Sequence, residues 1–361
     1  MWLRGAVAAC CALVLAAPPA WGSGVVRIKS KAARHLAQAP SGTYQNPVWG
    51  SFPDPMGAFT GIDYYAYSTG SRFPIIRSTN LVDWQTVGYA FDAPPSWSAG
   101  NPWAPSVLAD PRPCADRPAG STSTSCFYLY YVSLNNSLAT PSNCIGVATA
   151  DTPAGPFRDK GILTRSSGAT DPVRGPIGCG DSGGWSNIDP APYVTPGGTP
   201  YLYLSTGHDP TGAWKRTISV IPLAADRIHA AGSRRALFGA TRSWEAGVVE
   251  GPWVMRRNST YYLFYSGGNF GDASYAMGYA TAFSPNGTFA KASGNPILRS
   301  TADVIGPGGG SVTKSPSGAD WMLYHGRAIA GGPRTLRIDP LVWSGSSATV
   351  RGPTTTPQQA P

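Results

Sequence analysis

An aromatic strand pattern that recurs five times constrains the fold of this chain more than any other feature of its sequence. Each copy is six residues long, is rich in Tyr, Phe, Trp and Leu, and is bounded by turn-forming residues, as buried strands are. The copies are residues 63–68, 126–131, 200–205, 260–265 and 320–325, and their starts are 63, 74, 60 and 60 residues apart. Similarity at a nearly constant spacing predicts a repeat architecture.

The segments that flank the aromatic strand repeat as well. A short strand and a polar turn follow it, and residues 145–157 and 277–289 are closely alike at this place, which residues 80–84 fill in the first repeat. A unit of about four strands, arranged radially around an axis, is a propeller blade. We therefore predict an all-β fold, a five-bladed β-propeller spanning residues 43–345. The alternative, a β-sandwich, does not repeat at this spacing.

The two ends of the chain differ from the repeats. Arg4 and the apolar segment 5–17, which is too short to span a bilayer, predict a secretory signal peptide over residues 1–22. Residues 23–42 are expected to form a linker, and the Pro-, Thr- and Gln-rich residues 346–361 a disordered tail. The sequence thus predicts a secreted protein with no membrane segment.

Four cysteines remain after the predicted signal peptide, which favours two disulfides in an exported chain. Three pairings are possible. We favour Cys114 with Cys126, because this bridge closes a polar insertion, which leaves Cys144 with Cys179. The absence of a Cys-x-x-Cys pair argues against a zinc site.

The net charge of +9 has two interpretations. It could attract acidic wall polymers, or it could reflect a solvated linker, since four basic residues lie between positions 27 and 34. We favour the linker. No basic run is interleaved with aromatic residues, so no nucleic-acid partner is expected.

A short segment about ten residues before each aromatic strand is predicted to line the axis. Three of these segments carry a carboxylate at a matching position of the repeat. These carboxylates are Asp54, Asp189 and Glu250. Asp-Pro alone is typical of turns and caps, but a common offset in three repeats favours a functional cluster. Glycoside hydrolysis needs an acid and a carboxylate on opposite sides of the bond. We predict that Asp54 is the base that activates water, that Glu250 is the proton donor, and that Asp189 holds the donor and raises its pKa.

These motifs resemble glycoside hydrolase family 43, and the resemblance covers about residues 43–345. The segments that carry it are 46–47, 52–55, 78–84, 103–105, 186–190 and 250–267. The resemblance implies the five-bladed propeller of arabinanases, arabinofuranosidases and β-xylosidases and an inverting reaction. It matches Asp54 to the family's base, Glu250 to its acid and Asp189 to its pKa modulator.

The chain departs from the family pattern in two places. Many members have a His in the fifth-blade segment, which commonly helps to hold an axial cation through water, whereas residues 306–311 here are Gly-Pro-Gly-Gly-Gly-Ser. The resemblance therefore implies no required cofactor and leaves an axial calcium or sodium ion open. Many members also have Asp where this chain has Ser106, which could alter a subsite or a local hydrogen bond.

Six further residues are candidates for binding substrate: Trp103, Phe73, Trp185, Phe270, His325 and Arg327. Trp103 could stack on a sugar, whose C–H faces pack on aromatic rings, or could pack between blades. His325 could reach the sugar or the axis, or fill a core position. Arg327 could bind a sugar hydroxyl or pair with an acid.

The sequence as a whole predicts a secreted glycoside hydrolase that acts on arabinose- or xylose-containing plant cell-wall polysaccharide or oligosaccharide, with arabinan first. The alternatives are a non-catalytic carbohydrate-binding propeller and a β-xylosidase or galactanase of the same fold. A retaining fructan-cleaving propeller is disfavoured because no Asn-Asp-Pro-Asn segment is present. We expect a monomer. The sequence does not fix the sugar, the linkage, or endo against exo cleavage.

Overall fold

The computed structural model describes residues 42–138, 141–167, 176–179, 186–208 and 215–361. The predicted signal peptide, all of the predicted linker except residue 42, and Trp185 lie outside the described residues. In the described part of the chain, no helical segment has the length and apolarity needed to cross a bilayer.

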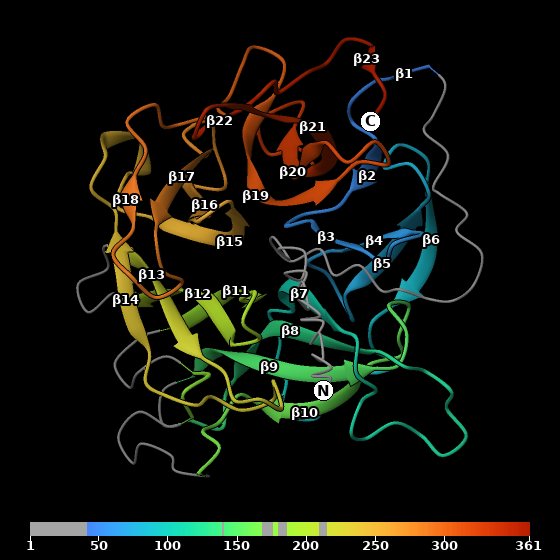
Figure 1. Ribbon diagram of the computed structural model, residues 1–361. Helices are drawn as coiled ribbons and strands as arrows, with labels where there is room; N and C mark the ends of the chain where they lie inside the picture. The colour runs from blue at the N-terminus through green and yellow to red at the C-terminus, as the bar shows by residue number, and fades with distance from the viewer. Residues whose placement is uncertain (1–41, 139–140, 168–175, 180–185, 209–214) are drawn as a thin grey trace, which may run out of the picture.

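Five antiparallel sheets stand around a central axis, as predicted (Figure 1). The first three blades are β3 Met56–Phe59, β4 Tyr64–Tyr67, β5 Pro74–Ser78 and β6 Trp84–Tyr89; β7 Trp103–Asp110, β8 Cys126–Asn135, β9 Ser142–Ala150 and β10 Arg158–Ile162; and β11 Ser186–Val194, β12 Pro200–His208, β13 Lys215–Pro222 and β14 Arg235–Gly239. The fourth is β15 Val249–Arg257, β16 Thr260–Gly267, β17 Ala276–Ala282 and β18 Ala290–Lys291, preceded by a 3₁₀ turn, η1 Ser243–Glu245. The fifth contains β19 Ile305–Lys314, β20 Asp320–Arg327, β21 Thr335–Ser344 and β22 Ser347–Val350.

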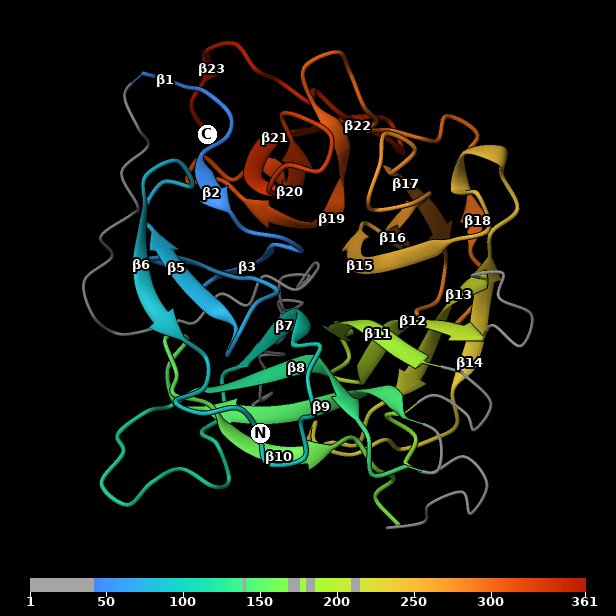
Figure 2. The same cartoon turned by 180° about the vertical axis from the view of Figure 1, so that it is seen from behind.

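The fifth blade closes the ring with a strand from the start of the chain. β2 Trp49–Ser51 pairs with β21, with Trp49 opposite Leu336, so the segment that leads into the first blade is also part of the last. A second pairing joins β1 Thr43–Tyr44 to β23 Gln358–Gln359, and these two strands lie side by side in Figure 2. Both pairings tie the two ends of the propeller together.

The prediction of a disordered tail over 346–361 was wrong. The reason is a buried carboxylate, Asp339, which accepts hydrogen bonds from Thr354 Oγ1 at 2.6 Å, from Tyr324 Oη at 2.6 Å and from Tyr44 Oη at 3.2 Å. A buried carboxylate needs such donors, so it holds the tail in place. Composition cannot reveal these partners, because two lie 15 residues from Asp339 and the third, Tyr44, lies 295 residues away.

The recurring aromatic strand is the second strand of each blade, and its tyrosines join neighbouring blades. Tyr67 donates a hydrogen bond to Pro153 O at 2.6 Å, Tyr130 to Arg227 O at 2.6 Å and Tyr203 to Pro285 O at 2.5 Å. Each acceptor lies in a connection after the third strand of the next blade. Burial of the rings and satisfaction of their hydroxyls at the same contact explain why the pattern recurs.

Phe73 belongs to this core and not to a binding site, which corrects the prediction. Its side chain is 1% exposed and packs against Phe91 and Tyr131, with ring centroids 6.0 and 5.4 Å away. The disulfide pairings were predicted correctly: Cys114 is bonded to Cys126, and Cys144 to Cys179.

The innermost segment of every blade bends at one residue with a left-handed backbone. These residues are Asp54, Ala104, Asp189, Gly251 and Gly309, with φ of 53°, 44°, 55°, 58° and 58°. Pro follows the first four. In blades two to five the pairing register with the second strand shifts at this point, as at a β-bulge. Such bulges redirect side chains, and here they turn one position of each blade towards the axis.

This bend corrects the predicted alignment of the three carboxylates. Asp54 and Asp189 are themselves the left-handed residues, but Glu250 lies one residue earlier, before Gly251. Glu250 therefore holds the repeat position of Trp103. All three predicted residues lie at the axis, but the repeat position predicted for Glu250 was wrong by one residue.

A second set of side chains links the bends of neighbouring blades. Thr69 Oγ1 accepts the N–H of Ala104 at 2.7 Å, Ser266 Oγ accepts that of Gly309 at 2.9 Å, and His325 Nδ1 accepts that of Asp54 at 3.1 Å. Each acceptor lies on or directly after the second strand of one blade, and each donor is the left-handed residue of the next. At the junction between the fifth and first blades, His325 thus accepts the backbone N–H that a hydroxyl accepts at two other junctions.

Candidate active site

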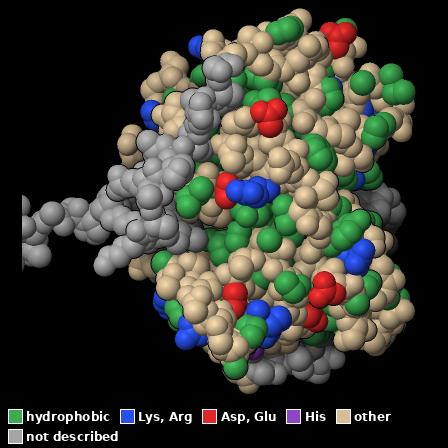
Figure 3. All heavy atoms as spheres, turned by 90° about the vertical axis from the view of Figure 1, so that its right-hand side faces the viewer, with side chains coloured by type: hydrophobic (Ala, Val, Ile, Leu, Met, Phe, Trp, Pro, Cys, Tyr) green, Lys and Arg blue, Asp and Glu red, His purple; other side chains and the backbone are tan. Residues whose placement is uncertain are grey.

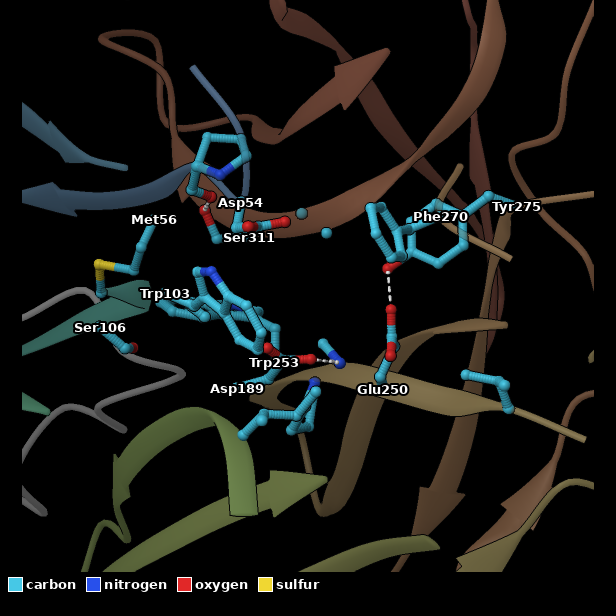
Figure 4. A pocket seen from close by; sticks show the side chains of 18 of the residues that line it. Asp54, Met56, Trp103, Ser106, Asp189, Glu250, Trp253, Phe270, Tyr275 and Ser311 are labelled. Atoms are coloured by element: carbon cyan, nitrogen blue, oxygen red, sulfur yellow. Dashed lines mark hydrogen bonds between the residues drawn. The ribbon is translucent and has the colours of Figure 1, made fainter. Parts of the chain in front are cut away.

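The bends of all five blades meet at a pocket of about 800 Å³ on the axis. Asp54, Trp103, Asp189, Glu250 and Gly309 line it, one from each blade. Figure 4 shows the three carboxylates around this common space, with Asp54 beside Ser311 and Glu250 beside Tyr275. The structure therefore brings together the three acids that the sequence singled out.

Asp54 is held by three contacts. Arg334 Nη1 donates to its Oδ1 at 2.9 Å, Thr69 Oγ1 donates to its Oδ2 at 2.6 Å, and its own N–H is taken by His325. The hydroxyl proton of Thr69 has a fixed direction, because the same oxygen accepts the N–H of Ala104. Both side-chain donors suit an ionised carboxylate, which accepts and does not donate.

Glu250 has different surroundings. Tyr275 Oη donates to its Oε1 at 2.9 Å, and Arg216 Nε lies 3.9 Å from its Oε2. Burial raises the pKa of Glu250, and the positive charge of Arg216 is the largest influence in the opposite direction. A carboxyl with a raised pKa retains a proton to donate.

Asp189 accepts the N–H of Gly251 at its Oδ2, at 2.8 Å, and so it binds the residue that directly follows Glu250. Burial, followed by the charges of Glu250 and Asp54, raises the pKa of Asp189 to about 8. Like charges in one pocket oppose full ionisation, so we expect Asp189 and Glu250 to retain a proton between them near neutral pH.

Two of the predicted substrate-binding residues line the pocket. Trp103 is 37% exposed and Phe270 is 51% exposed, and they come from the second blade and from the β16–β17 loop. Partly exposed rings at a pocket are suited to stack on sugar faces. Trp185, the third predicted aromatic residue besides Phe73, lies outside the described residues.

His325 and Arg327 are not at the pocket surface, which corrects both predictions. The side chain of His325 is fully buried behind Asp54. Arg327 is 6% exposed, and it donates to Phe270 O at 2.6 Å and to Gly332 O at 3.1 Å. Arg327 thus anchors the loop that presents Phe270, and it does not reach into the pocket.

Four residues around the carboxylates were missed by sequence reasoning: Thr69, Arg216, Tyr275 and Arg334. Arg216 and Tyr275 lie on or near third strands, and Arg334 directly precedes one. No motif marks any of them. Only the closed ring brings them to the axis, so no local signal could have found them.

The side chains of the described residues offer no cluster of ligands for an axial cation. No group of three or more His, Cys, Asp or Glu side chains among them is arranged to hold a metal ion. Burial lowers the pKa of His325 to about 3, so its ring is neutral. Because Nδ1 accepts the Asp54 N–H, the proton is on Nε2, which then offers no lone pair. We assign no chemical step to a metal.

The positive net charge does not gather over one region of the face in Figure 3. Among the described residues visible there, Lys and Arg side chains are scattered, and several lie beside Asp or Glu. This distribution does not suggest a surface for a polyanion on that face.

Comparison with known proteins agrees with the fold and the pocket. The model of "Glycosyl hydrolases family 43" matches residues 44–347. Beta-D-galactofuranosidase xynD of Aspergillus niger is 29% identical over 308 residues, covering 81% of this chain and 79% of that protein. Arabinan endo-1,5-alpha-L-arabinosidase C of Emericella nidulans is 28% identical over 313 residues, covering 78% and 86%.

Solved structures show the same architecture. A thermostable family-43 glycoside hydrolase superposes with a TM-score of 0.73 at 29% identity, covering 88% of this chain and 99% of that one. An endo-1,4-beta-xylanase from Bacteroides thetaiotaomicron gives 0.66 at 28% identity, covering 88% and 98%. With a family match over most of its length and a carboxylate pocket on the propeller axis, this chain belongs to glycosyl hydrolase family 43 and is a glycosidase that hydrolyses O-glycosyl bonds.

Proposed function

We propose that the protein is a secreted, inverting glycoside hydrolase that cleaves arabinose- or xylose-containing plant cell-wall polysaccharide, with arabinan the first substrate to test. The observation that carries the proposal is the contrast between two carboxylates in one pocket. Asp54 receives donors from Arg334 and Thr69, whereas Glu250 is buried with a raised pKa. A carboxylate that accepts from two directed donors suits the role of base, and a carboxyl with a raised pKa suits the role of acid.

In this scheme Asp54 accepts a proton from the water that attacks the anomeric carbon. Glu250 gives its proton to the departing glycosidic oxygen, and the bond to the leaving group breaks as the bond to water forms. Tyr275 fixes the orientation of Glu250 through its Oη. Asp189 orients the strand beside Glu250 through the N–H of Gly251, and the two neighbouring carboxyl groups oppose each other's ionisation.

The choice of substrate class rests on the relatives. The names of three of them specify galactofuranose, arabinan and xylan chemistry. Trp103 and Phe270 provide two apolar faces for a sugar chain at the pocket. A β-xylosidase or galactanase of the same fold remains the second candidate on the same grounds. A binding-only propeller is disfavoured, because it has no need of three carboxylates held by directed donors.

Secretion is supported by the two disulfides, which are typical of an oxidising compartment. It agrees with the signal peptide expected over residues 1–22. We propose a monomer that acts on an external polymer, with no nucleic-acid partner.

The decisive experiment is hydrolysis of arabinan, arabinoxylan and galactan by the wild type, D54N and E250A, with NMR of the first-formed anomer. We expect inverted product from the wild type and no turnover by D54N. E250A should lose about 10²–10⁴-fold on an alkyl glycoside and much less on a p-nitrophenyl glycoside, which needs no protonation. Retained configuration, or wild-type turnover by D54N, would exclude the proposed roles. A crystal structure should show the Asp54 and Glu250 carboxyl groups about 6.5–9.5 Å apart, as inversion requires.

A further inference from the structure

His325 and Tyr275 form a stacked pair directly behind the two proposed catalytic carboxylates. The ring centroids are 5.8 Å apart and the ring planes are 4° from parallel. Both side chains are buried, with His325 fully enclosed and Tyr275 2% exposed. The pair belongs to two different blades, since His325 lies on β20 and Tyr275 directly precedes β17.

Each ring of the pair contacts one of the two carboxylate residues. His325 Nδ1 accepts the N–H of Asp54 at 3.1 Å, and Tyr275 Oη donates to Glu250 Oε1 at 2.9 Å. The stack therefore forms an unbroken connection from the proposed base to the proposed acid. No other side chain is needed to join them.

The glycines of the fifth blade make room for this pair. A Cβ on Gly308 would overlap the ring of Tyr275, at 2.5 Å from Cδ1. A Cβ on Gly309 would lie 2.6 Å from His325 Cε1 and 2.9 Å from Asp54 Oδ1. Backbone without side chains thus lies directly against both rings. This accounts for Gly308 and Gly309 in the fifth blade, one of the two blades that contribute no carboxylate.

We propose that the His325–Tyr275 pair, seated on Gly308 and Gly309, is a positioning unit that fixes the placement of Asp54 and Glu250 relative to each other. This inference rests on the proposed function and deepens it. His325 acts through the backbone of Asp54 and through the ring of Tyr275, and it does not touch substrate. A shift of either ring would displace one carboxylate against the other, and displacements near 1 Å cost about 10²-fold in rate.

The two contacts of His325 can be removed one at a time. H325F keeps a ring for Tyr275 to stack on but has no acceptor for the Asp54 N–H. H325N keeps an acceptor near the place of Nδ1 but removes the ring. Y275F keeps the stack and removes the donor to Glu250. H229N is the matched control, because His229 is a surface residue that pairs with Asp226.

The measurement is kcat and KM on two glycosides of one sugar, with p-nitrophenyl and with methyl leaving groups, alongside the melting temperature. H325F should lose at least ~10-fold in kcat/KM on both substrates, because a displaced base affects them equally. H325N and Y275F should lose more on the methyl glycoside, because a displaced acid matters most for a poor leaving group. H229N should match the wild type.

The inference is overturned if H325F and H325N have the same leaving-group dependence, or if their losses only follow their melting temperatures. D54N and E250A, assayed in parallel, separate this failure from that of the proposed function. If D54N is inactive on both substrates, E250A loses activity mainly on the methyl glycoside, and the His325 pattern is absent, the positioning unit alone is wrong. If D54N retains full turnover, or E250A retains full turnover of the methyl glycoside, the proposed function itself is wrong.

Discussion

The guanidinium of Arg334 contacts the proposed base and an aromatic ring of the pocket at once. Its Nη1 lies 2.9 Å from Asp54 Oδ1, and its Cζ lies 5.3 Å from the centroid of Phe270. Arg327 holds the backbone of the same Phe270. On one side of the pocket, Arg334 therefore connects the proposed base Asp54 to Phe270, the ring proposed to contact the sugar.

Arg334 should matter more for its planar, directed contacts than for its charge. R334K should lower kcat/KM by about 10-fold or more on both aryl and alkyl glycosides, because an ammonium cannot meet Asp54 and lie flat over Phe270 together. Steady-state kinetics on the two substrates checks this. R72K is the matched control, since Arg72 lies 4.2 Å over Tyr89 and does not line the pocket. Full activity of R334K would show that its positive charge alone is sufficient.

Thr69 links the base to the second blade by one hydroxyl that accepts from Ala104 and donates to Asp54. T69V keeps the volume and loses both bonds, which leaves the Ala104 N–H without an acceptor. We expect about 1–3 kcal/mol lower stability and a fall in kcat, with T69S restoring both. Thermal unfolding and kinetics of the three proteins test this. A T69V protein that loses stability but keeps its kcat would remove Thr69 from the positioning of the base.

The architecture was predictable because one kind of contact repeats. Tyrosines such as Tyr67 and Tyr203 reach the next blade from equivalent places, and such a pattern survives as a spacing in the sequence. The place of Asp54 and Asp189 at the axis was predictable for the same reason, because their segments recur at a common offset before the aromatic strands. Glu250 was found through the same offset before the aromatic strand, but its position one residue before the bend has no local signature.

The rest of the site depends on contacts between residues far apart in the chain. Arg334 and Asp54 are 280 residues apart, and they meet only because the fifth blade closes against the first. The residue type also does not reveal how exposed a side chain is. Phe73 is 1% exposed, whereas Phe270 is 51% exposed. The tail was misjudged for a similar reason, because Asp339, which holds it, belongs to β21.

The pKa of Asp189 gives the fold a dependence on pH. Its folded value is raised to about 8 from the usual 3.8, so the folded state binds a proton that the unfolded state releases. Stability from this group is fully present below about pH 4 and is lost as pH rises through about 8. D189N has no such titration and keeps an acceptor for the Gly251 N–H. We therefore expect D189N to gain melting temperature relative to the wild type as pH rises from 5 to 9.

Melting curves of wild type, D189N and D303N over this range provide the comparison. D303N is the control, because Asp303 is an exposed carboxylate outside the pocket. A difference between D189N and wild type that is constant with pH would mean that Asp189 does not hold a proton in the folded protein.

Thr354 should separate stability from catalysis. Its hydroxyl donates to Asp339 Oδ1 at 2.6 Å and accepts from Asn46 Nδ2 at 3.1 Å, so it joins the tail to the fifth blade and to the segment before β2. T354V loses both contacts and should lower stability by about 1–3 kcal/mol. Because Thr354 does not line the pocket, kcat and KM at a low temperature should equal those of the wild type. A changed kcat would indicate that ring closure is coupled to the geometry of the carboxylates.

Phe270 and Phe73 give the sharpest test of what the structure adds to the sequence. Both are plausible sugar platforms by residue type, but Phe270 lines the pocket beneath the guanidinium of Arg334, and Phe73 packs against Phe91 and Tyr131. F73A should lower stability by about 3–5 kcal/mol through the cavity it leaves, with KM unchanged wherever the protein is folded. F270A should leave the melting temperature nearly unchanged, because its ring is half exposed.

The effect of F270A should appear in substrate binding. Loss of the ring should raise KM for the polymer more than for a small aryl glycoside, since a platform at the rim meets the sugars next to the cleaved bond. We would measure kinetics on both substrates and thermal unfolding for F270A and F73A. Together these measurements show whether each ring acts in substrate binding or in stability. The two variants must show opposite profiles, one in binding and one in stability. If F270A behaves like F73A, the exposed ring is part of the scaffold, and Trp103 is left as the aromatic surface at the pocket.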